Sequence, residues 1–80
     1  MEHYIVINDW ATEYESGVDV KGVAHALEEA KHIFNQYVDE ERDYAKKLGW
    51  TVYEDGDVCF DAGKNGYYVS AHSKLYIQRI

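Results

Sequence analysis

The side chains with the most evident catalytic potential are the single cysteine, Cys59, and the four histidines, His3, His25, His32 and His72. A cysteine nucleophile needs a base such as histidine to take its proton. Acids surround Cys59 in the sequence, at Glu54, Asp57 and Asp61, and carboxylates close to a thiol raise its pKa and lower its reactivity. Because no neighbouring residue activates the thiol, we expect Cys59 to be an ordinary strand side chain, and we predict no catalytic residue.

Metal binding has equally little support in the spacing of the ligands. Asp55, Asp57 and Asp61 form an acidic turn, but the turn lacks the further oxygen ligands and the closing glutamate of a twelve-residue calcium loop. His25 and His32 are seven residues apart, not the four that place two histidines on one zinc ion. The chain also has no glycine-rich phosphate loop. We therefore predict no metal and no other cofactor.

Aromatic residues are better candidates for a binding surface. The chain has two tryptophans, eight tyrosines and two phenylalanines in 80 residues. Tyrosine is common at interfaces because it buries a large area while its hydroxyl keeps a polar partner. The alternative is that these rings simply occupy the wet face of a one-layer sheet. The side chains that we expect in an interaction surface are Trp10, Tyr53, Tyr67, Tyr68 and Tyr76.

The charge is strongly acidic, with 15 Asp and Glu against 8 Lys and Arg, a formal net charge of −7. Direct binding to a phosphate backbone is therefore not expected. Acidic runs on one surface would instead imitate phosphates and occupy a basic groove, whereas the alternative is a set of solvated loops. The two runs that contain no basic residue are Asp9, Glu13, Glu15 and Asp19, and Glu54, Asp55, Asp57 and Asp61.

The element that must position these residues is a long helix over Leu27–Leu48. Apolar residues recur there in steps of three and four, which is typical of a helix with one buried face. Only Glu41 interrupts this stripe. Lys46 and Lys47 in the last turn, with Gly49 behind them, predict the C-terminal end, whereas the N-terminal end has no good capping residue. The stripe consists of Leu27, Ala30, Ile33, Phe34, Tyr37, Val38, Glu41, Tyr44, Ala45 and Leu48.

Short β-branched and aromatic runs predict strands on both sides of this helix. We expect strands at 4–7, 18–23, 50–54, 57–61 and 75–80. A further short run at 67–69, which a break at 72–74 separates from the last strand, leaves open whether three or four strands follow the helix. Gly22 predicts a bulge or a close backbone approach in the second strand. Asp55-Gly56 and Asn65-Gly66 are strong turn signals. The order predicts one α+β domain over residues 1–80, β-β-α-β-β-β, with a single long helix packed on one face of a mainly antiparallel sheet.

One helix covers one sheet face, so the opposite face is left for water, a second copy or a partner.

The N-terminal residues lack a basic segment and a long apolar run, so we expect no signal peptide and no membrane span. The single cysteine cannot form an internal disulfide. We therefore expect a cytoplasmic protein.

Three segments carry a resemblance: Tyr-Ile-Val-Ile-Asn-Asp-Trp at 4–10, Gly-Val-Ala-His-Ala-Leu-Glu-Glu-Ala-Lys at 22–31, and Gly-Tyr-Tyr-Val-Ser with Lys-Leu-Tyr-Ile-Gln at 66–70 and 74–78. They resemble small uncharacterised proteins of Gram-positive bacteria and their phages, in which a hairpin precedes a helix and further strands. The resemblance implies a bacterial or phage setting and carries over no activity or site.

Two functional hypotheses follow. The first is a small acidic, non-enzymatic interaction module that binds a protein partner or itself, as a homodimer, through the open sheet face or a strand edge. The alternative is a phosphate-mimicking inhibitor of a nucleic-acid-processing protein, which requires the acidic runs to share one surface.

Overall fold

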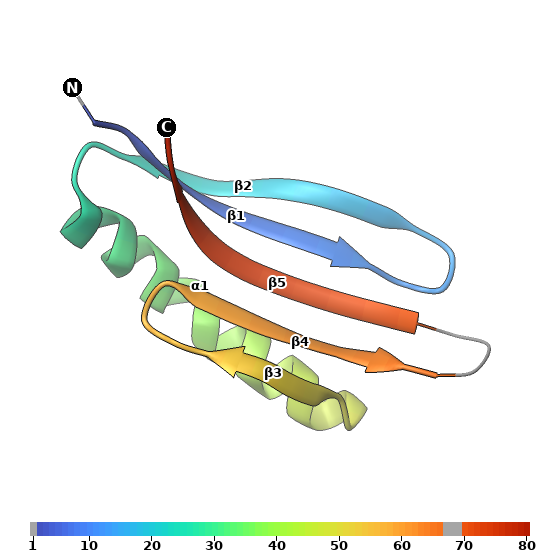
Figure 1. Cartoon of the computed structure of the whole chain (residues 1–80). Coiled ribbons are helices and arrows are strands. Elements are labelled where there is room, and N and C mark those ends of the chain that lie inside the picture. The colour runs from blue at the N-terminus through green and yellow to red at the C-terminus, as the bar shows by residue number, and fades with distance from the viewer. Residues whose placement is uncertain (1, 67–69) are drawn as a thin grey trace.

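The computed structural model describes residues 2–66 and 70–80. Within them, β1 (Tyr4–Ala11) and β2 (Ser16–Ala24) form a hairpin, α1 (Leu27–Leu48) follows, and β3 (Thr51–Asp55), β4 (Cys59–Asn65) and β5 (Ser70–Arg79) complete the chain (Figure 1). The predicted α+β class and β-β-α-β-β-β order are confirmed. Tyr67 and Tyr68, two of the expected interface residues, lie outside the described residues.

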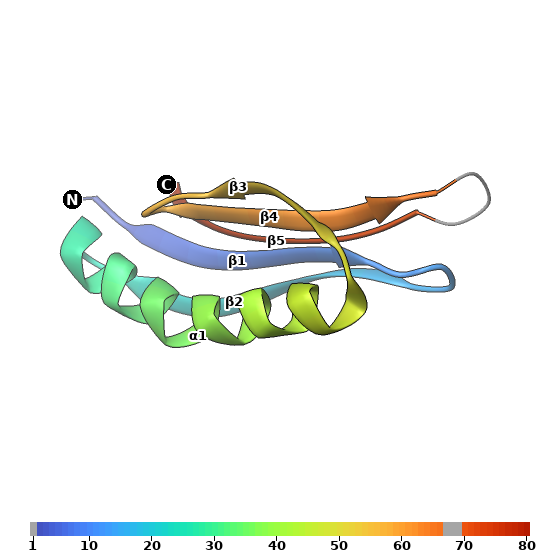
Figure 2. The ribbon, with the colours of Figure 1, turned by 90° about the horizontal axis from the view of Figure 1, so that it is seen from below.

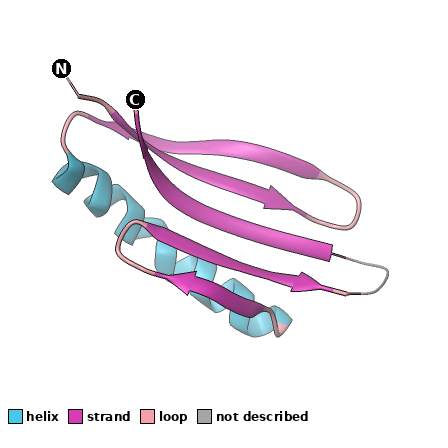
Figure 3. Cartoon of the chain, viewed as in Figure 1, coloured by secondary structure: helices cyan, strands magenta, loops and turns pink. Residues whose placement is uncertain are grey.

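The helix connects the two edges of the sheet. Among the described residues the strand order is β2-β1-β5-β4-β3, and every neighbouring pair is antiparallel. Because β2 and β3 are the edge strands, α1 has to cross the sheet between them, and it contacts β1, β2, β4 and β5 on the way. Figure 2 shows α1 on one side of the sheet, and Figure 3 shows the same arrangement by secondary structure. The other face has no covering element from the described residues.

The core lies between the helix and the side of the sheet that faces it. Phe34 and Val38 of α1 meet Val6, Phe60 and Leu75 of β1, β4 and β5, and all five side chains are at most 2% exposed. The even-numbered residues of β1 face the helix, as Tyr4, Val6 and Asn8 show by their burial. The predicted apolar stripe therefore covers the sheet through its central part.

The stripe is less buried toward its ends than its spacing predicts. Leu27, Tyr44 and Leu48 are 38%, 50% and 46% exposed. The expectation that Tyr44 belongs to the core is wrong, because α1 runs toward an edge strand at each end and meets fewer strands there. Tyr44 instead packs edge to face with Trp50, with ring centroids 5.4 Å apart and planes at 88°.

The helix ends as predicted. Gly49 adopts the left-handed conformation with φ 69°, which glycine reaches without steric cost. Its N–H and that of Trp50 donate to the carbonyls of Lys46 and Ala45, at 3.2 and 2.9 Å. At the other end Ala26 is the N-cap and offers no side-chain hydrogen bond, in agreement with the weak start signal. This C-terminal cap directs Trp50 back toward α1.

Several strand limits differ from those predicted. β1 continues to Ala11 and β5 has no break at 72–74, because these strands pair with each other from Tyr4 and Arg79 to Ala11 and His72. Pairing on both sides of β1 overrides the polar character of residues 8 and 9.

The structure follows the signal at Gly22 more closely than the one at Gly56. The register of β1 and β2 shifts beside Gly22, and a Cβ there would lie 2.9 Å from Ile33 of the helix, which confirms both the bulge and the close approach. The hairpin that Asp55-Gly56 predicts is present between β3 and β4, but its tip lies two residues later than predicted. The Gly56 N–H donates to the Cys59 carbonyl at 2.9 Å, so residues 57 and 58 form the tip. Asp55 pairs with Phe60 and so still belongs to β3.

Candidate functional site

The uncovered face of the sheet carries an apolar patch, which we define as Ile5, Ile7, Val18, Val20, Val23 and Tyr76. Cross-strand pairing places Ile7 between Val20 and Tyr76, and Ile5 opposite Val23. The three valines, on edge strand β2, are 58–64% exposed. Ile7 is only 7% exposed, because its neighbours on both sides cover it. Apolar side chains therefore continue across three strands on the face that the helix leaves bare.

A row of charges borders the apolar patch. Lys74 of β5 lies between Asp9 of β1 and Asp61 of β4, and Glu54 of β3 is next to Asp61. The Lys74 ammonium lies 5.1 Å from the centroid of the Tyr76 ring, within the range of a cation–π contact. The row thus offers both signs of charge beside an apolar surface.

Cys59 lies on this face, next to Tyr76. Burial is the largest of several effects that together raise the pKa of its thiol to about 11; a hydrogen bond with Glu54 and the negative charges of Glu54 and Asp61 also raise the pKa, and Lys74 lowers it. A thiol with this pKa stays protonated at neutral pH and is a poor nucleophile. The sequence predicts that neighbouring acids raise the pKa of Cys59, and Glu54 and Asp61 do so.

The metal-ligating side chains do not converge. Across residues 2–66 and 70–80, no three His, Cys, Asp or Glu side chains come together around a common point. His3 and His25 approach each other, with their Nδ1 atoms 3.2 Å apart. In the acidic turn, Asp55 is bound instead by the Arg42 guanidinium, whose Nη2 lies 2.7 Å from Oδ1, and this contact lowers the Asp55 pKa.

The structure does not gather the expected interface residues on one surface. Tyr76 lies in the apolar patch. Tyr53 is 56% exposed at the irregularity in β3. Trp10 lies on the helix side, because it has the same parity as Val6 and Asn8 in β1. The structure therefore places Tyr76 and Trp10 on opposite sides of the sheet.

The acidic runs are also distributed over several surfaces. Asp9, Glu54 and Asp61 are on the uncovered face, whereas Asp19 and Asp55 pair with Asn8 and Phe60 on the helix side. The remaining acids lie in turns: Glu13 and Glu15 in the β1–β2 turn, and Asp57 in the β3–β4 turn at the other end of the sheet (Figure 1). This distribution gives no observation in favour of a phosphate mimic.

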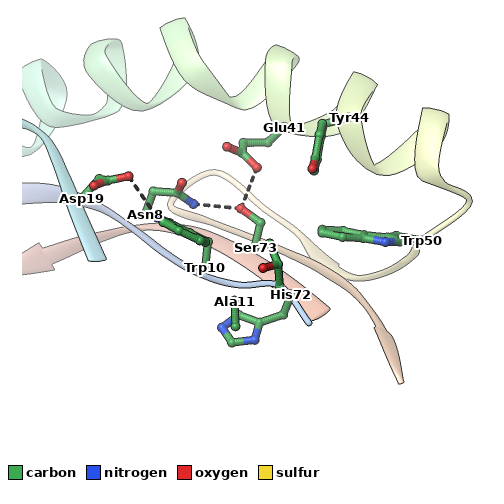
Figure 4. Close-up of a pocket in the computed structure, with 10 residues that line it drawn as sticks. Asn8, Trp10, Ala11, Asp19, Glu41, Tyr44, Trp50, His72 and Ser73 are labelled. Atoms are coloured by element: carbon green, nitrogen blue, oxygen red, sulfur yellow. Dashed lines mark hydrogen bonds between the residues drawn. The ribbon is translucent and has the colours of Figure 1, made fainter. Parts of the chain in front are cut away.

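A pocket of about 270 Å³ lies on the helix side, near the C-terminal end of α1. Trp10 of β1, Tyr44 of α1 and Trp50 form aromatic walls, and Glu41 of α1 points into it from the helix toward Ser73 of β5 (Figure 4). These are the only two tryptophans of the chain. The pocket thus combines three rings with a carboxylate.

A chain of hydrogen bonds holds Glu41 at the pocket. Asn8 Nδ2 donates to Ser73 Oγ at 2.9 Å, and Ser73 Oγ donates to Glu41 Oε2 at 2.8 Å. Asn8 Nδ2 also lies 3.3 Å from the Lys74 carbonyl. Asn8 and Ser73, 6% and 7% exposed, are the only buried polar side chains in the described part of the chain. The buried polar groups of this fold are therefore concentrated beneath Glu41.

The pocket is not predicted by the sequence patterns, although the sequence contains one signal for it. Glu41 interrupts an otherwise apolar stripe, and a lone carboxylate on the buried face of a helix needs a partner. Asn8 and Ser73 carried no comparable signal, because one follows an apolar run and the other lies in a polar segment.

No family model, no curated protein and no solved structure matches the chain. The described residues include no helix with the length and apolar character needed to cross a bilayer.

Proposed function

We propose that this protein is a non-enzymatic interaction module and that its partner is a second copy of the same chain, bound through the apolar patch. The observation that carries the proposal is the group of exposed valines beside Ile7 and Tyr76 on the uncovered face. Apolar side chains gathered on one surface commonly mark an interaction site. We further propose a cytoplasmic location without direct nucleic-acid contacts, given the lone cysteine and the acidic charge.

The face is a better interface than either edge of the sheet. Exposed edges pair with other chains unless bulges, charges or a short length prevent it. β2 has a bulge beside Gly22, and Asp19 and Lys21 lie along it. β3 has only five residues, an irregularity at Tyr53, and two acids at its end. Both edges therefore carry features that oppose strand addition.

Three properties favour a second copy as the occupant. Twofold homodimers are the commonest oligomers of soluble proteins, and their interfaces are more apolar than those of transient complexes. A chain of this size buries a modest fraction of its surface on folding, so a second layer over the uncovered face adds core that one copy lacks. The charged row also contains both signs, so Lys74 of one copy is available to the acids of the other.

Sedimentation equilibrium of the purified chain over a concentration series tests this proposal. We expect a monomer–dimer equilibrium that Val20→Gln weakens at least about tenfold, equivalent to about 1.4 kcal/mol. Val52→Gln is the matched control, because Val52 is also a half-exposed valine of an edge strand, but lies on the helix side. A wild-type chain that remains monomeric at millimolar concentration contradicts the proposal, and so does an equal effect of the two variants.

A further inference from the structure

We infer that the pocket between Trp10, Tyr44 and Trp50 binds an organic monocation, an alkylammonium or guanidinium group, against the Glu41 carboxylate. This site lies on the helix side of the sheet, away from the apolar patch, and does not depend on self-association.

The aromatic walls are suited to a cation. A positive group over the face of Trp or Tyr, within about 6 Å of the ring centroid, is attracted by the ring quadrupole. Tyr44 and Trp50 meet edge to face, with their planes at 88°. One of the two rings therefore contributes only its edge to this contact, and the other ring covers neither of its faces. Trp10 lies across the pocket from them (Figure 4). A group in the space between meets aromatic surface from more than one direction.

The position of Trp10 is fixed from two sides. Its indole Nε1–H donates to Asp19 Oδ2 at 3.0 Å, which adds a second carboxylate to the pocket lining. The absence of a side chain at Gly17 lets the ring lie against β2, because a Cβ there would be 2.8 Å from Trp10 Cζ2. The ring that closes this side of the pocket is therefore held in place before any ligand arrives.

Carboxylates dominate the charge of the pocket. Glu41 and Asp19 line it, and no Lys or Arg does so among the described residues. His72 also lines it, and its Nε2 lies 3.5 Å from a carboxylate of its own, Asp9 Oδ1. Within residues 2–66 and 70–80, the Ser73 hydroxyl is the only donor to the Glu41 carboxylate, and it reaches only Oε2. Glu41 Oε1 therefore remains available to accept a hydrogen bond from an ammonium or guanidinium group or to lie against a quaternary ammonium.

The size of the space limits the ligand. Pockets for drug-sized molecules have volumes of roughly 300–1,000 Å³, and this one has about 270 Å³. It is therefore suited to a single cationic head group. Such a group belongs either to a small free amine or to a lysine or arginine side chain that a protein inserts, and the experiment below separates these two sources.

The test uses the whole chain and four probes: choline, its neutral isostere 3,3-dimethyl-1-butanol, and lysine and arginine blocked at both ends as N-acetyl N-methylamides. Tryptophan fluorescence and the indole N–H resonances report binding directly, because both tryptophans of the chain line the pocket. We expect saturable changes with at least one cation, with a dissociation constant of about 1 mM or lower, and none with the neutral isostere. Binding of a blocked amino acid indicates an inserted side chain, and binding of choline alone indicates a free amine.

Two variants distinguish binding in the pocket from general electrostatic attraction of a cation to the acidic chain. Glu41→Gln keeps an acceptor for Ser73 but removes the charge, and we expect it to weaken cation binding about tenfold. Glu40→Gln, the same change at the next and exposed residue of α1, should have no effect. If Glu41→Gln does not fold, Tyr44→Leu replaces it, with the same expected loss. No saturable change with any cation overturns the inference, as does equal binding of the neutral isostere or an equal effect of the two glutamate variants.

Discussion

The buried polar chain from Asn8 through Ser73 to Glu41 permits a prediction that separates stability from function. Ser73→Ala removes one hydrogen bond to a carboxylate and one from a buried amide, at 2.8 and 2.9 Å. Water can reach the partly buried Glu41, which limits that loss to about 1 kcal/mol, and the amide donor of Asn8 that loses its partner costs about 1 kcal/mol more. We therefore expect Ser73→Ala to lower the free energy of unfolding by about 2 kcal/mol.

The triple variant Asn8→Val, Ser73→Ala and Glu41→Leu should behave in the opposite way. It removes all three side chains of the polar chain together, and it extends the apolar stripe of α1 over apolar strand residues. Replacing all members of a buried polar network by apolar groups is often neutral or stabilising. We expect the triple variant to be at least as stable as the wild-type chain, and to lose the binding of cations.

Thermal and urea unfolding, followed by circular dichroism, measure both effects. For a domain of this size 1 kcal/mol shifts the melting temperature by about 4–8 °C, so Ser73→Ala should melt about 8–16 °C lower. A change below about 0.5 kcal/mol in Ser73→Ala, the usual range for surface substitutions, would show that the hydrogen bonds do not form in solution. A triple variant less stable than Ser73→Ala would show that the polar chain stabilises the fold. The three polar residues would then be explained by stability alone, without a binding function.

Three further predictions concern other parts of the chain. Because its pKa is about 11 rather than near 9, Cys59 should react with iodoacetamide at pH 8 about a hundredfold more slowly than in the urea-unfolded chain, and Glu54→Gln should speed the reaction; equal rates contradict this. The Arg42 contact lowers the Asp55 pKa, so its stabilisation is present above about pH 4 and is lost as the pH falls through the lowered pKa. Asp55→Asn should therefore melt lower than wild type at pH 7 but equally at pH 2, and a difference that persists in acid refutes the assignment. Phe34→Ala, at a side chain 1% exposed, should lower the free energy of unfolding by about 3–5 kcal/mol in urea titrations; a loss below 1 kcal/mol would place Phe34 outside the core.

The sequence predicted those parts of the fold that depend on local patterns. The helix limits are reproduced because an apolar stripe and a glycine in the left-handed conformation are local signals. Gly22 correctly predicted a bulge and a close approach, which the structure shows to be an approach to Ile33. The extent of β1 and β5 was underestimated because their ends are stabilised by pairing with each other, over more than 60 residues of sequence, and not by their own composition.

The candidate sites were harder to predict, for a related reason. Adjacent strand residues face opposite sides of a sheet, so the side to which Trp10 belongs depends on whether β1 continues without a bend. The pocket requires Trp10, Glu41 and Ser73 to meet from three elements, and only the register of the sheet brings them together. An acidic run in a strand is likewise divided between two faces, as Glu54 and Asp55 of β3 show.

The two proposed sites are the two places where the chain departs from what a helix on a sheet requires. Glu41 occupies a position of the helix stripe where an apolar residue would pack better, and Asn8 and Ser73 occupy buried strand positions for the same polar chain. The exposed valines of β2 occupy a face where polar residues would keep a single copy monomeric. Each departure costs stability or specificity in the isolated chain. A fold maintained for its own stability alone does not need either of them, whereas a bound cation on one side and a second copy on the other account for both.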